Sequence, residues 1–276
     1  MPMRSLRQGG FLYLTLDDAP TRNALSPEMV EELRAAVEAA AADATLRALV
    51  LRGANGFFCA GGSMGNFHKS QQSAATAGED DPIAANNRRF GDFMLTLARL
   101  PKVLVVVVEG AAMGGGFGLA CAADIVLARR DTKFALSETT LGLVPAQIAP
   151  FVVARIGQAS ARRLALSGER IDGAEAQRIG LVDFVAEDAT ALDARLLAVL
   201  RGIARCAPGA NAATKALLQE CAEVDLAPIL DRAAQAFARQ MRSEGAEGVA
   251  AFGDKRDAAW VEKIERLPPA ADNDHV

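Results

Sequence analysis

A short glycine-rich segment, Gly114–Gly118, reads Gly-Gly-Gly-Phe-Gly and follows the apolar run Val103–Val108. Glycine has no side chain to shield the backbone, so N–H groups at a junction between a strand and a helix stay open to a ligand oxygen. The positive end of the helix dipole favours negative charge at the same place. These residue types in this position therefore predict a site that binds an oxyanion.

A second turn of the same kind, Phe57–Ser63, lies earlier in the chain after the predicted strand 47–52. Two turns that each point one N–H group into a common space would supply the two donors that an enolate or a tetrahedral oxyanion needs. The alternative is that these glycines only allow a helix and a sheet to pack closely. Neither turn has the Gly-Lys-Ser/Thr ending of a P-loop or the spacing of a dinucleotide-binding turn.

One carboxylate, Glu138, stands among apolar and turn residues in the segment Phe134–Pro145. Burial in such surroundings would raise the pKa of its carboxyl group and suit it to proton transfer near neutral pH. The segment alone leaves a second interpretation open, in which Glu138 is a helix cap or a surface residue.

Alternating strands and helices must position these groups. Residues 11–16 alternate as a strand does, and Ser26 begins a helix because it is an N-cap followed by a first-turn proline and acid. Apolar residues at helical spacing between Phe90 and Leu97 predict another helix. The polar stretch 69–81 has no periodicity and is interpreted as a loop.

The C-terminal third of the chain is predicted to be almost entirely helical. Strands and helices alternate up to about residue 186, and the segments after it have helical periodicity: 189–204, 208–220, 225–241 and 244–252. We therefore predict an α/β fold with a core over 1–188, a helical C-terminal region over 189–267 and a disordered tail over 268–276.

The composition argues against nucleic-acid-binding, membrane-spanning and metal-binding functions. The chain has 276 residues, of which 51% are hydrophobic, and a net charge of −4 that offers no basic field to nucleic acid or an anionic membrane. The residues 1–5 lack the apolar core typical of a signal peptide, and no apolar stretch of the sequence is long enough to span a membrane, so we expect neither a signal peptide nor a membrane span. The four cysteines form no C-x-x-C pair and there are only two histidines. We expect a cytoplasmic enzyme without a metal site.

The ordered set of motifs resembles the crotonase superfamily, the enoyl-CoA hydratase/isomerase family. The segments that match, in chain order, are 23–26, 58–62, 109–120, 121–124, 134–142 and 248–256. The resemblance implies a spiral of ββα units with a helical C-terminal region that forms a homotrimer, or a dimer of trimers. It also implies an acyl-CoA substrate and no separate cofactor, because coenzyme A enters as part of the substrate.

The resemblance implies roles for individual residues. The backbone N–H groups of Ala60 and Gly115 would hold the thioester oxygen and stabilise an enolate, and Glu138 would be the catalytic carboxylate. Phe252 and Lys255 would reach coenzyme A from a neighbouring subunit, and the backbone around Arg22 would line its adenine. The complete set implied to bind substrate or coenzyme A is Arg22, Ala24, Gly61, Gly62, Ser63, Met64, Gly114, Gly118, Ala146, Gln147, Phe252 and Lys255.

Two departures from the common hydratase pattern bear on the substrate. Common hydratases carry a second glutamate two residues after the glycine triplet, where this chain has Gly118. The segment 144–157 also lacks their Pro-Gly-Ala/Gly-Gly-Gly continuation. Both features are similar to bacterial hydratases of branched glutaconyl-CoA esters, which are 3-methylglutaconyl-CoA in leucine catabolism and isohexenylglutaconyl-CoA in acyclic terpene catabolism. Such substrates carry a distal carboxylate, and we hypothesise that it helps to place the water.

Two other functions stay open at this point. An enoyl-CoA isomerase needs only one glutamate, which moves a proton between two carbons. A catalytically silent protein of the same fold would act as a binding partner, although the retained Glu138 and both glycine turns argue against it.

Overall fold

The computed structural model describes residues 2–63, 82–220, 244, 247, 250, 251, 254–263 and 265–268. The strands are β1 (Met3–Gln8), β2 (Phe11–Leu16), β3 (Ala48–Gly53), β4 (Val103–Val108), β5 (Ala111–Met113), β6 (Ile125–Arg129), β7 (Lys133–Ala135), β8 (Arg170–Ile171) and β9 (Phe184–Ala186). The α-helices are α1 (Pro27–Ala42), α3 (Pro82–Ala98), α4 (Gly115–Cys121), α5 (Ala149–Ser167), α6 (Gly173–Arg178), α7 (Ala189–Ala204) and α8 (Pro208–Glu220). Two 3-10 helices are η1 (Ala19–Thr21) and η2 (Glu138–Leu141).

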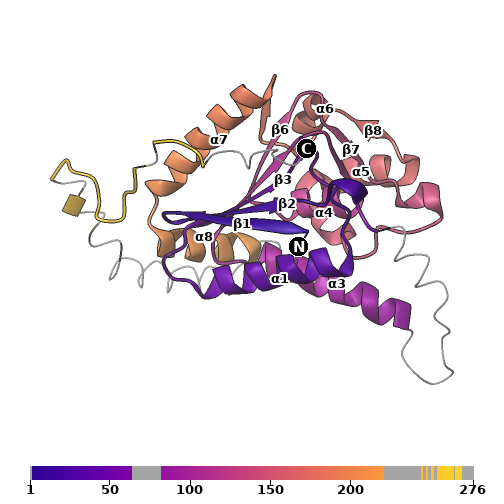
Figure 1. The fold of residues 1–276 in the computed structure, drawn as a ribbon, viewed down its shortest axis with the longest axis horizontal. Helices are drawn as coiled ribbons and strands as arrows, with labels where there is room; N and C mark the ends of the chain where they lie inside the picture. Colours follow the sequence, from indigo (N-terminus) through magenta and orange to yellow (C-terminus); the bar gives the residue numbers. More distant parts are fainter. Residues whose placement is uncertain are drawn as a thin grey trace.

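A six-stranded sheet forms the centre of the molecule, with the strand order β1-β2-β3-β4-β6-β9 (Figure 1). All neighbours in it are parallel except β1, which is antiparallel to β2. A second sheet has the order β5-β7-β8. Because β3 and β4 are parallel neighbours, the chain leaves both at the same edge of the large sheet. The first glycine turn follows β3 there, and the second follows β5, which comes directly after β4.

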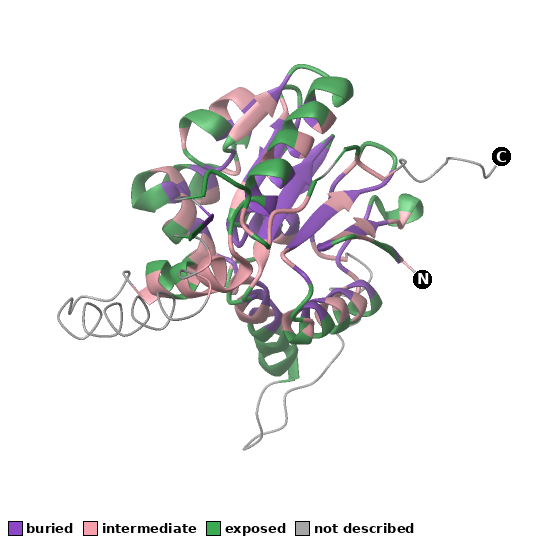
Figure 2. Ribbon diagram, turned by 90° about the vertical axis from the view of Figure 1, so that its left-hand side faces the viewer, coloured by how far each residue is buried: buried purple, intermediate pink, exposed green. Residues whose placement is uncertain are grey.

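The two faces of the large sheet enter separate cores, because neighbouring side chains of a strand point to opposite sides. In β4, Leu104 and Val106 belong to the core that α1 and α3 cover. Val105 and Val107 point the other way and pack with the apolar face of α7. Figure 2 shows the buried strands between more exposed helices. The sheet is thus a rigid support that is covered on both faces.

Most of the predicted elements are confirmed by the structure. The strands over 11–16 and 103–108 and the helices over 189–204 and 208–220 have the predicted bounds, and Ser26 caps α1 by accepting a hydrogen bond from Met29 N at 3.2 Å. The loop predicted over 69–81 and the helix predicted over 225–241 lie outside the described residues, as does part of 244–252.

Two strands before the glycine triplet were not predicted, β1 and the three-residue β5, which lies between β4 and the second glycine turn. In β1, only Met3 is buried and most of its other side chains are exposed, so the strand has no apolar alternation that the sequence could reveal. It is held by backbone pairing with β2 along its whole length.

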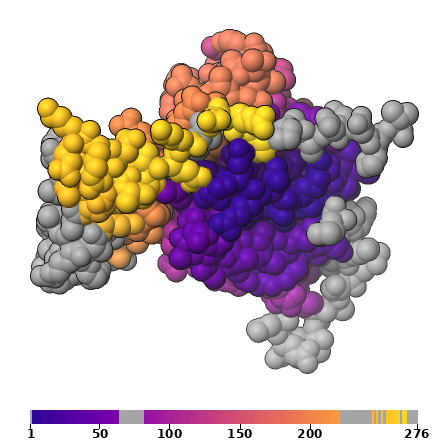
Figure 3. All heavy atoms as spheres, turned by 60° about the vertical axis from the view of Figure 1, so that its left-hand side comes forward, coloured from indigo at the N-terminus to yellow at the C-terminus, as the bar shows by residue number. Residues whose placement is uncertain are grey.

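Residues near the C-terminus fold back over the N-terminal strands (Figure 3). Glu262 accepts hydrogen bonds from Gly10 N and forms an ion pair with Arg47. The Trp260 indole donates to Arg205 O at 3.1 Å, at the end of α7. These contacts fix the segment 254–263 against the core.

Candidate active site

The second glycine turn passes from strand β5 into helix α4. Gly114 is the N-cap residue, with φ of 48°, and its N–H donates to Ala135 O at 3.0 Å. Gly115 is the first residue of the helix, so its N–H has no acceptor within the helix, and among the described residues none is found elsewhere. This N–H is therefore open to a ligand, as the sequence predicts.

The first glycine turn lies directly beside the second. Cys59 N donates to Ala111 O and Met113 N donates to Cys59 O, both at 3.0 Å. Gly61 has φ of 95°, and a Cβ at this position would be 2.8 Å from Met113 O. Only glycine allows the two turns to approach this closely. The arrangement brings both turns to one place, which the sequence predicts.

The role predicted for Ala60 needs correction. Its N–H donates to Arg22 O at 3.0 Å, so this donor is already engaged within the protein and does not point at a ligand. Gly62, two residues later, pairs with Leu25 as an isolated bridge, and its N–H has no acceptor among the described residues. Leu25 also lies 2.8 Å from the Cβ position of Gly115. The open donor of this turn is thus at Gly62, beside Gly115.

The segment predicted to line the coenzyme A adenine has an unusual backbone. Arg22 and Asn23 both have left-handed φ angles, of 55° and 57°. Asn23 is buried, where its side chain accepts from Asp18 N and donates to Phe57 O, both at 2.7 Å. The Arg22 guanidinium is exposed and lies 5.9 Å from the centre of the Phe57 ring. Strained backbone of this kind persists where its surroundings hold it, and it is concentrated at ligand sites.

The carboxyl group of Glu138 lies against the second turn. Glu138 begins η2, and its Oε1 is 2.9 Å from the Cβ position of Gly114. Its Oε2 is buried and has no hydrogen-bond partner among the described residues. Burial raises the pKa of this carboxyl above its usual value. A carboxyl in this state is suited to accept or return a proton beside the open N–H of Gly115.

The position of the missing second glutamate is filled by an apolar side chain. A Cβ at Gly118 would be 2.3 Å from Ile148 Cγ2 and 2.9 Å from Ile148 Cβ. Ile148 is only 3% exposed and belongs to the main core. The sequence shows that the glutamate is absent, whereas the structure shows that a side chain at this position would have to displace Ile148.

The other predicted site residues are distributed around this centre. Ala24 is buried, Ser63 is half-buried and Ala146 is exposed. Gln147 donates to Asn87 Oδ1 at 2.9 Å and so joins the loop before α5 to helix α3. Lys255 is exposed. Met64 and Phe252 lie outside the described residues.

An ion pair with a buried carboxylate lies beside the first turn and was not identified from the sequence. Glu109 is 6% exposed, and its carboxylate accepts from Arg52 at 2.8 Å, while Arg52 also pairs with Asp193 of α7. The backbone carbonyl of Glu109 accepts from Phe58 N at 2.9 Å, at the start of the first turn. The signal in the sequence was the position of Glu109, a charged residue between the apolar run 103–108 and the glycine triplet.

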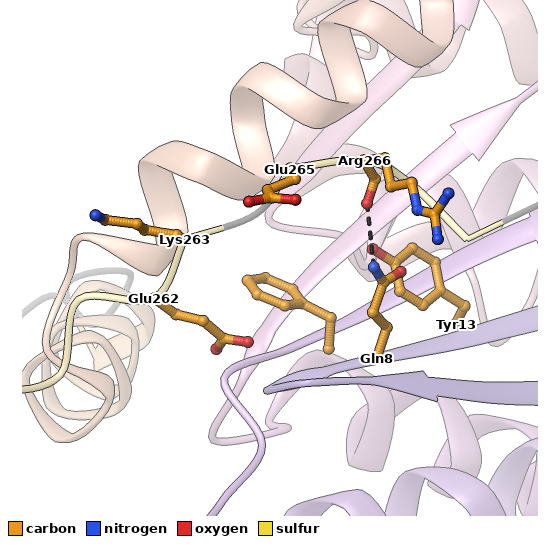
Figure 4. Close-up of a pocket in the computed structure, with 7 residues that line it drawn as sticks. Gln8, Tyr13, Glu262, Lys263, Glu265 and Arg266 are labelled. Atoms are coloured by element: carbon orange, nitrogen blue, oxygen red, sulfur yellow. Dashed lines mark hydrogen bonds between the residues drawn. The ribbon is translucent and has the colours of Figure 1, made fainter.

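A separate cavity of about 210 Å³ lies beneath the C-terminal segment (Figure 4). Its lining includes Tyr13, Glu262 and Arg266, and Gln8 donates to Arg266 O at 3.1 Å across it. Burial raises the pKa of Tyr13 to about 12. None of the predicted site residues lines this cavity, so it is distinct from the centre around Glu138.

The described residues contain no group of three or more histidine, cysteine or acidic side chains placed to hold a metal ion. They also contain no helix with the length and apolar character needed to cross a membrane.

Comparison with known proteins decides the family. The family profile described as enoyl-CoA hydratase/isomerase matches residues 7–263. The chain belongs to the enoyl-CoA hydratase/isomerase family. The crotonase fold and the membership predicted from the motifs are thereby confirmed, and the protein is an enzyme of the enoyl-CoA hydratase type, a carbon–oxygen lyase.

Solved structures of this family are similar over nearly the whole chain. An enoyl-CoA hydratase/isomerase from Marinobacter aquaeolei is 45% identical with a TM-score of 0.91, covering 95% of this chain and 99% of its own. Pseudomonas aeruginosa AtuE is 46% identical with a TM-score of 0.91, covering 95% of this chain and 100% of its own.

Relatives with named activities are more distant. The 2,3-dehydroadipyl-CoA hydratase of Escherichia coli is 33% identical over 91% of this chain and 94% of its own length. The mitochondrial methylglutaconyl-CoA hydratase of Mus musculus is 30% identical over 90% of this chain and 78% of its own length.

Proposed function

We propose that this enzyme adds water to an enoyl-CoA whose acyl group carries a distal carboxylate, a branched glutaconyl-type ester such as isohexenylglutaconyl-CoA or 3-methylglutaconyl-CoA. The observation that carries the proposal is that Glu138 lies beside the second turn, whereas Gly118, where common hydratases carry a second glutamate, is covered by Ile148 in the described part of the chain. The Glu138 carboxyl is one hydrogen-bond partner for the attacking water. The distal carboxylate of the substrate would be the second partner.

The proposed chemistry uses the two open backbone donors. The N–H groups of Gly62 and Gly115 hold the thioester oxygen and stabilise the negative charge that develops there when water attacks C3. Glu138, ionised, takes a proton from the water as its oxygen bonds to C3. The same carboxyl then returns a proton to C2 of the enolate, so one glutamate completes the addition and is regenerated.

The names of two relatives support a substrate of this class. Adipyl and glutaconyl groups both derive from dicarboxylic acids, so the hydratases named for them act on acyl chains with a far carboxylate. A site that depends on a polar group of its substrate discriminates strongly against an analogue without that group, because a needed partner is then missing.

A panel of CoA esters tests the proposal. We expect 3-methylglutaconyl-CoA or isohexenylglutaconyl-CoA to be hydrated with a kcat/KM about 100-fold above that of crotonyl-CoA. The loss of absorbance of the conjugated enoyl thioester measures the reaction. Equal turnover of crotonyl-CoA would overturn the role of the distal carboxylate and leave general hydratase activity intact.

An isomerase is the second candidate, because one glutamate is enough to move a proton between C2 and C4. The same absorbance separates the two reactions. Hydration removes the conjugated thioester, whereas isomerisation of a 3-enoyl ester creates it. A protein that binds acyl-CoA esters in calorimetry and turns over none of them would instead be the silent binding partner.

We propose in addition that the enzyme assembles as a homotrimer or a dimer of trimers, in which Lys255 and Phe252 reach the coenzyme A of a neighbour. Exposed apolar side chains at Leu141, Val144 and Leu166 are consistent with a covered surface. Light scattering of the purified protein measures the mass. A monomeric species with full activity would overturn the proposal.

A further inference from the structure

Two glycines at the start of helix α4 have different neighbours. Gly114 is the N-cap and Gly118 lies in the first turn of the helix, and the hydrogen bond from Gly118 N to Gly114 O at 3.0 Å places their backbones one helical turn apart, about 5.4 Å along the axis. Glu138 Oε1 lies 2.9 Å from the Cβ position of Gly114. Ile148 Cγ2 lies 2.3 Å from the Cβ position of Gly118.

Both the Cβ and the Cγ2 atoms of Ile148 occupy the space beside Gly118. Ile148 Cβ itself is 2.9 Å from the Cβ position of Gly118, so no rotation of the side chain would clear the space. The residue is 3% exposed, and its carbonyl accepts from Val152 N at the start of α5. The start of α5 therefore holds this methyl-bearing group against Gly118, one helical turn from Gly114, whose Cβ position the Glu138 carboxyl approaches.

We propose that Ile148 is a positioning residue for Glu138: it occupies the space beside Gly118 and keeps the adjoining side of the carboxyl group apolar and closed to a second polar side chain. The proposal rests on the proposed function, because it explains how the site works with one carboxyl. It is consistent with the buried Oε2 of Glu138, which has no partner among the described residues.

The charged side chains of the described helices around Ile148 are paired or exposed. Helix α3, which Asn87 joins to Gln147, carries Arg88, paired with Asp92, and the exposed Arg89. Helix α4 contains no charged residue. The charged residues of α5 are Arg155, paired with Asp183, Arg163, paired with Glu169 and Glu175, and the exposed Arg162.

Variants that enlarge the side chain at position 118 and shorten it at position 148 test the packing. Gly118→Glu alone has to displace Ile148, and we expect a lower Tm and roughly tenfold lower activity. The double variant Gly118→Glu/Ile148→Ala should melt above Gly118→Glu and should raise the ratio of crotonyl-CoA to 3-methylglutaconyl-CoA hydration roughly tenfold over the unchanged protein. If Gly118→Glu alone melts and reacts like the unchanged protein, the proposal is overturned.

A matched pair, Ile148→Val and Ile148→Thr, tests the effect on Glu138. The two side chains have nearly the same shape, but threonine places a hydroxyl group beside the carboxyl. We expect the acid limb of the pH profile of kcat/KM to move to lower pH in the threonine variant only, because a polar neighbour favours the ionised carboxyl. Identical profiles for the two variants would show a purely structural role.

The two tests separate this inference from the proposed function. If the unchanged protein hydrates none of the esters, the proposed function fails. The melting temperatures of the variants at positions 118 and 148 still decide whether Ile148 excludes a side chain at position 118.

Discussion

The two glycine turns of the proposed active site each leave one backbone N–H open to a ligand, but they do so in different ways. In each turn, one N–H is used within the protein and a later one stays open: Ala60 N bonds to Arg22 O and Gly114 N bonds to Ala135 O. In the second turn, the open donor at Gly115 comes from the start of helix α4. In the first turn, the open donor at Gly62 depends on which backbone groups a distant segment has already engaged.

The difference shows which donors can be predicted. A helix start leaves its first N–H groups without a partner in the helix, so the open N–H of Gly115 follows from local sequence. The Ala60 N–H is engaged because Arg22 and Asn23 adopt left-handed backbone and bring a carbonyl to it. That contact joins segments far apart in the chain, so no local sequence pattern predicts it.

The largest effect is expected for a variant of Glu138 that removes proton transfer and leaves the backbone donors of the two turns unchanged. Glu138→Gln keeps the shape of the side chain and removes its ability to take a proton, so we expect kcat to fall by about 10³-fold or more. The affinity for a non-reactive acyl-CoA should be unchanged in calorimetry, because both turns are intact. A variant that loses affinity and retains kcat would contradict the assignment.

Replacing a single backbone N–H by an ester oxygen tests the two donors of the first turn against each other. Removing an oxyanion donor costs about 10²- to 10³-fold in kcat, and we expect this loss for the ester at Gly62. The ester at Ala60 removes only the bond to Arg22 O, so it should lower Tm while kcat is largely kept. The opposite result would restore Ala60 as the donor.

Alanine at one glycine of each turn sharpens the comparison further. At Gly61, the new methyl group meets the immobile Met113 O at 2.8 Å with φ of 95°, so we expect a lower Tm and about 100-fold lower kcat/KM. At Gly115, it meets the mobile end of Leu25, and alanine favours the helix, so Tm should hold and kcat/KM should fall only about tenfold. Equal losses at both positions would show that the turns are equally tolerant.

Much of the fold and part of the site follow from the sequence. The alternation in 11–16, the cap at Ser26 and the apolar setting of Glu138 are local signals, and the structure agrees with each. The side chain beside Gly118 could not be predicted, because it depends on how α5 packs against α4. Strand β1 was missed because an exposed edge strand carries little apolar pattern.

The smallest expected effect measures what it costs to keep the Glu138 carboxyl beside the second turn. Burial raises its folded pKa above the unfolded value, so the unfolded chain ionises first as pH rises from about 4.5 and the folded state loses stability over the interval up to the folded pKa. At pH 4 or below, both states are protonated and the cost disappears. Glu138→Gln should therefore raise Tm at pH 7 and have little effect at pH 4.

Melting curves at the two pH values measure this difference, and Glu31→Gln is a matched control on a fully exposed carboxyl. Arg34 lowers the pKa of Glu31, so removing that charge should slightly lower Tm at pH 7, which is the opposite sign. If Glu138→Gln also lowered Tm at pH 7, the carboxylate would have a stabilising partner. An attractive interaction near the second turn would then stabilise the ionised Glu138 carboxyl, and its burial would not destabilise the folded state.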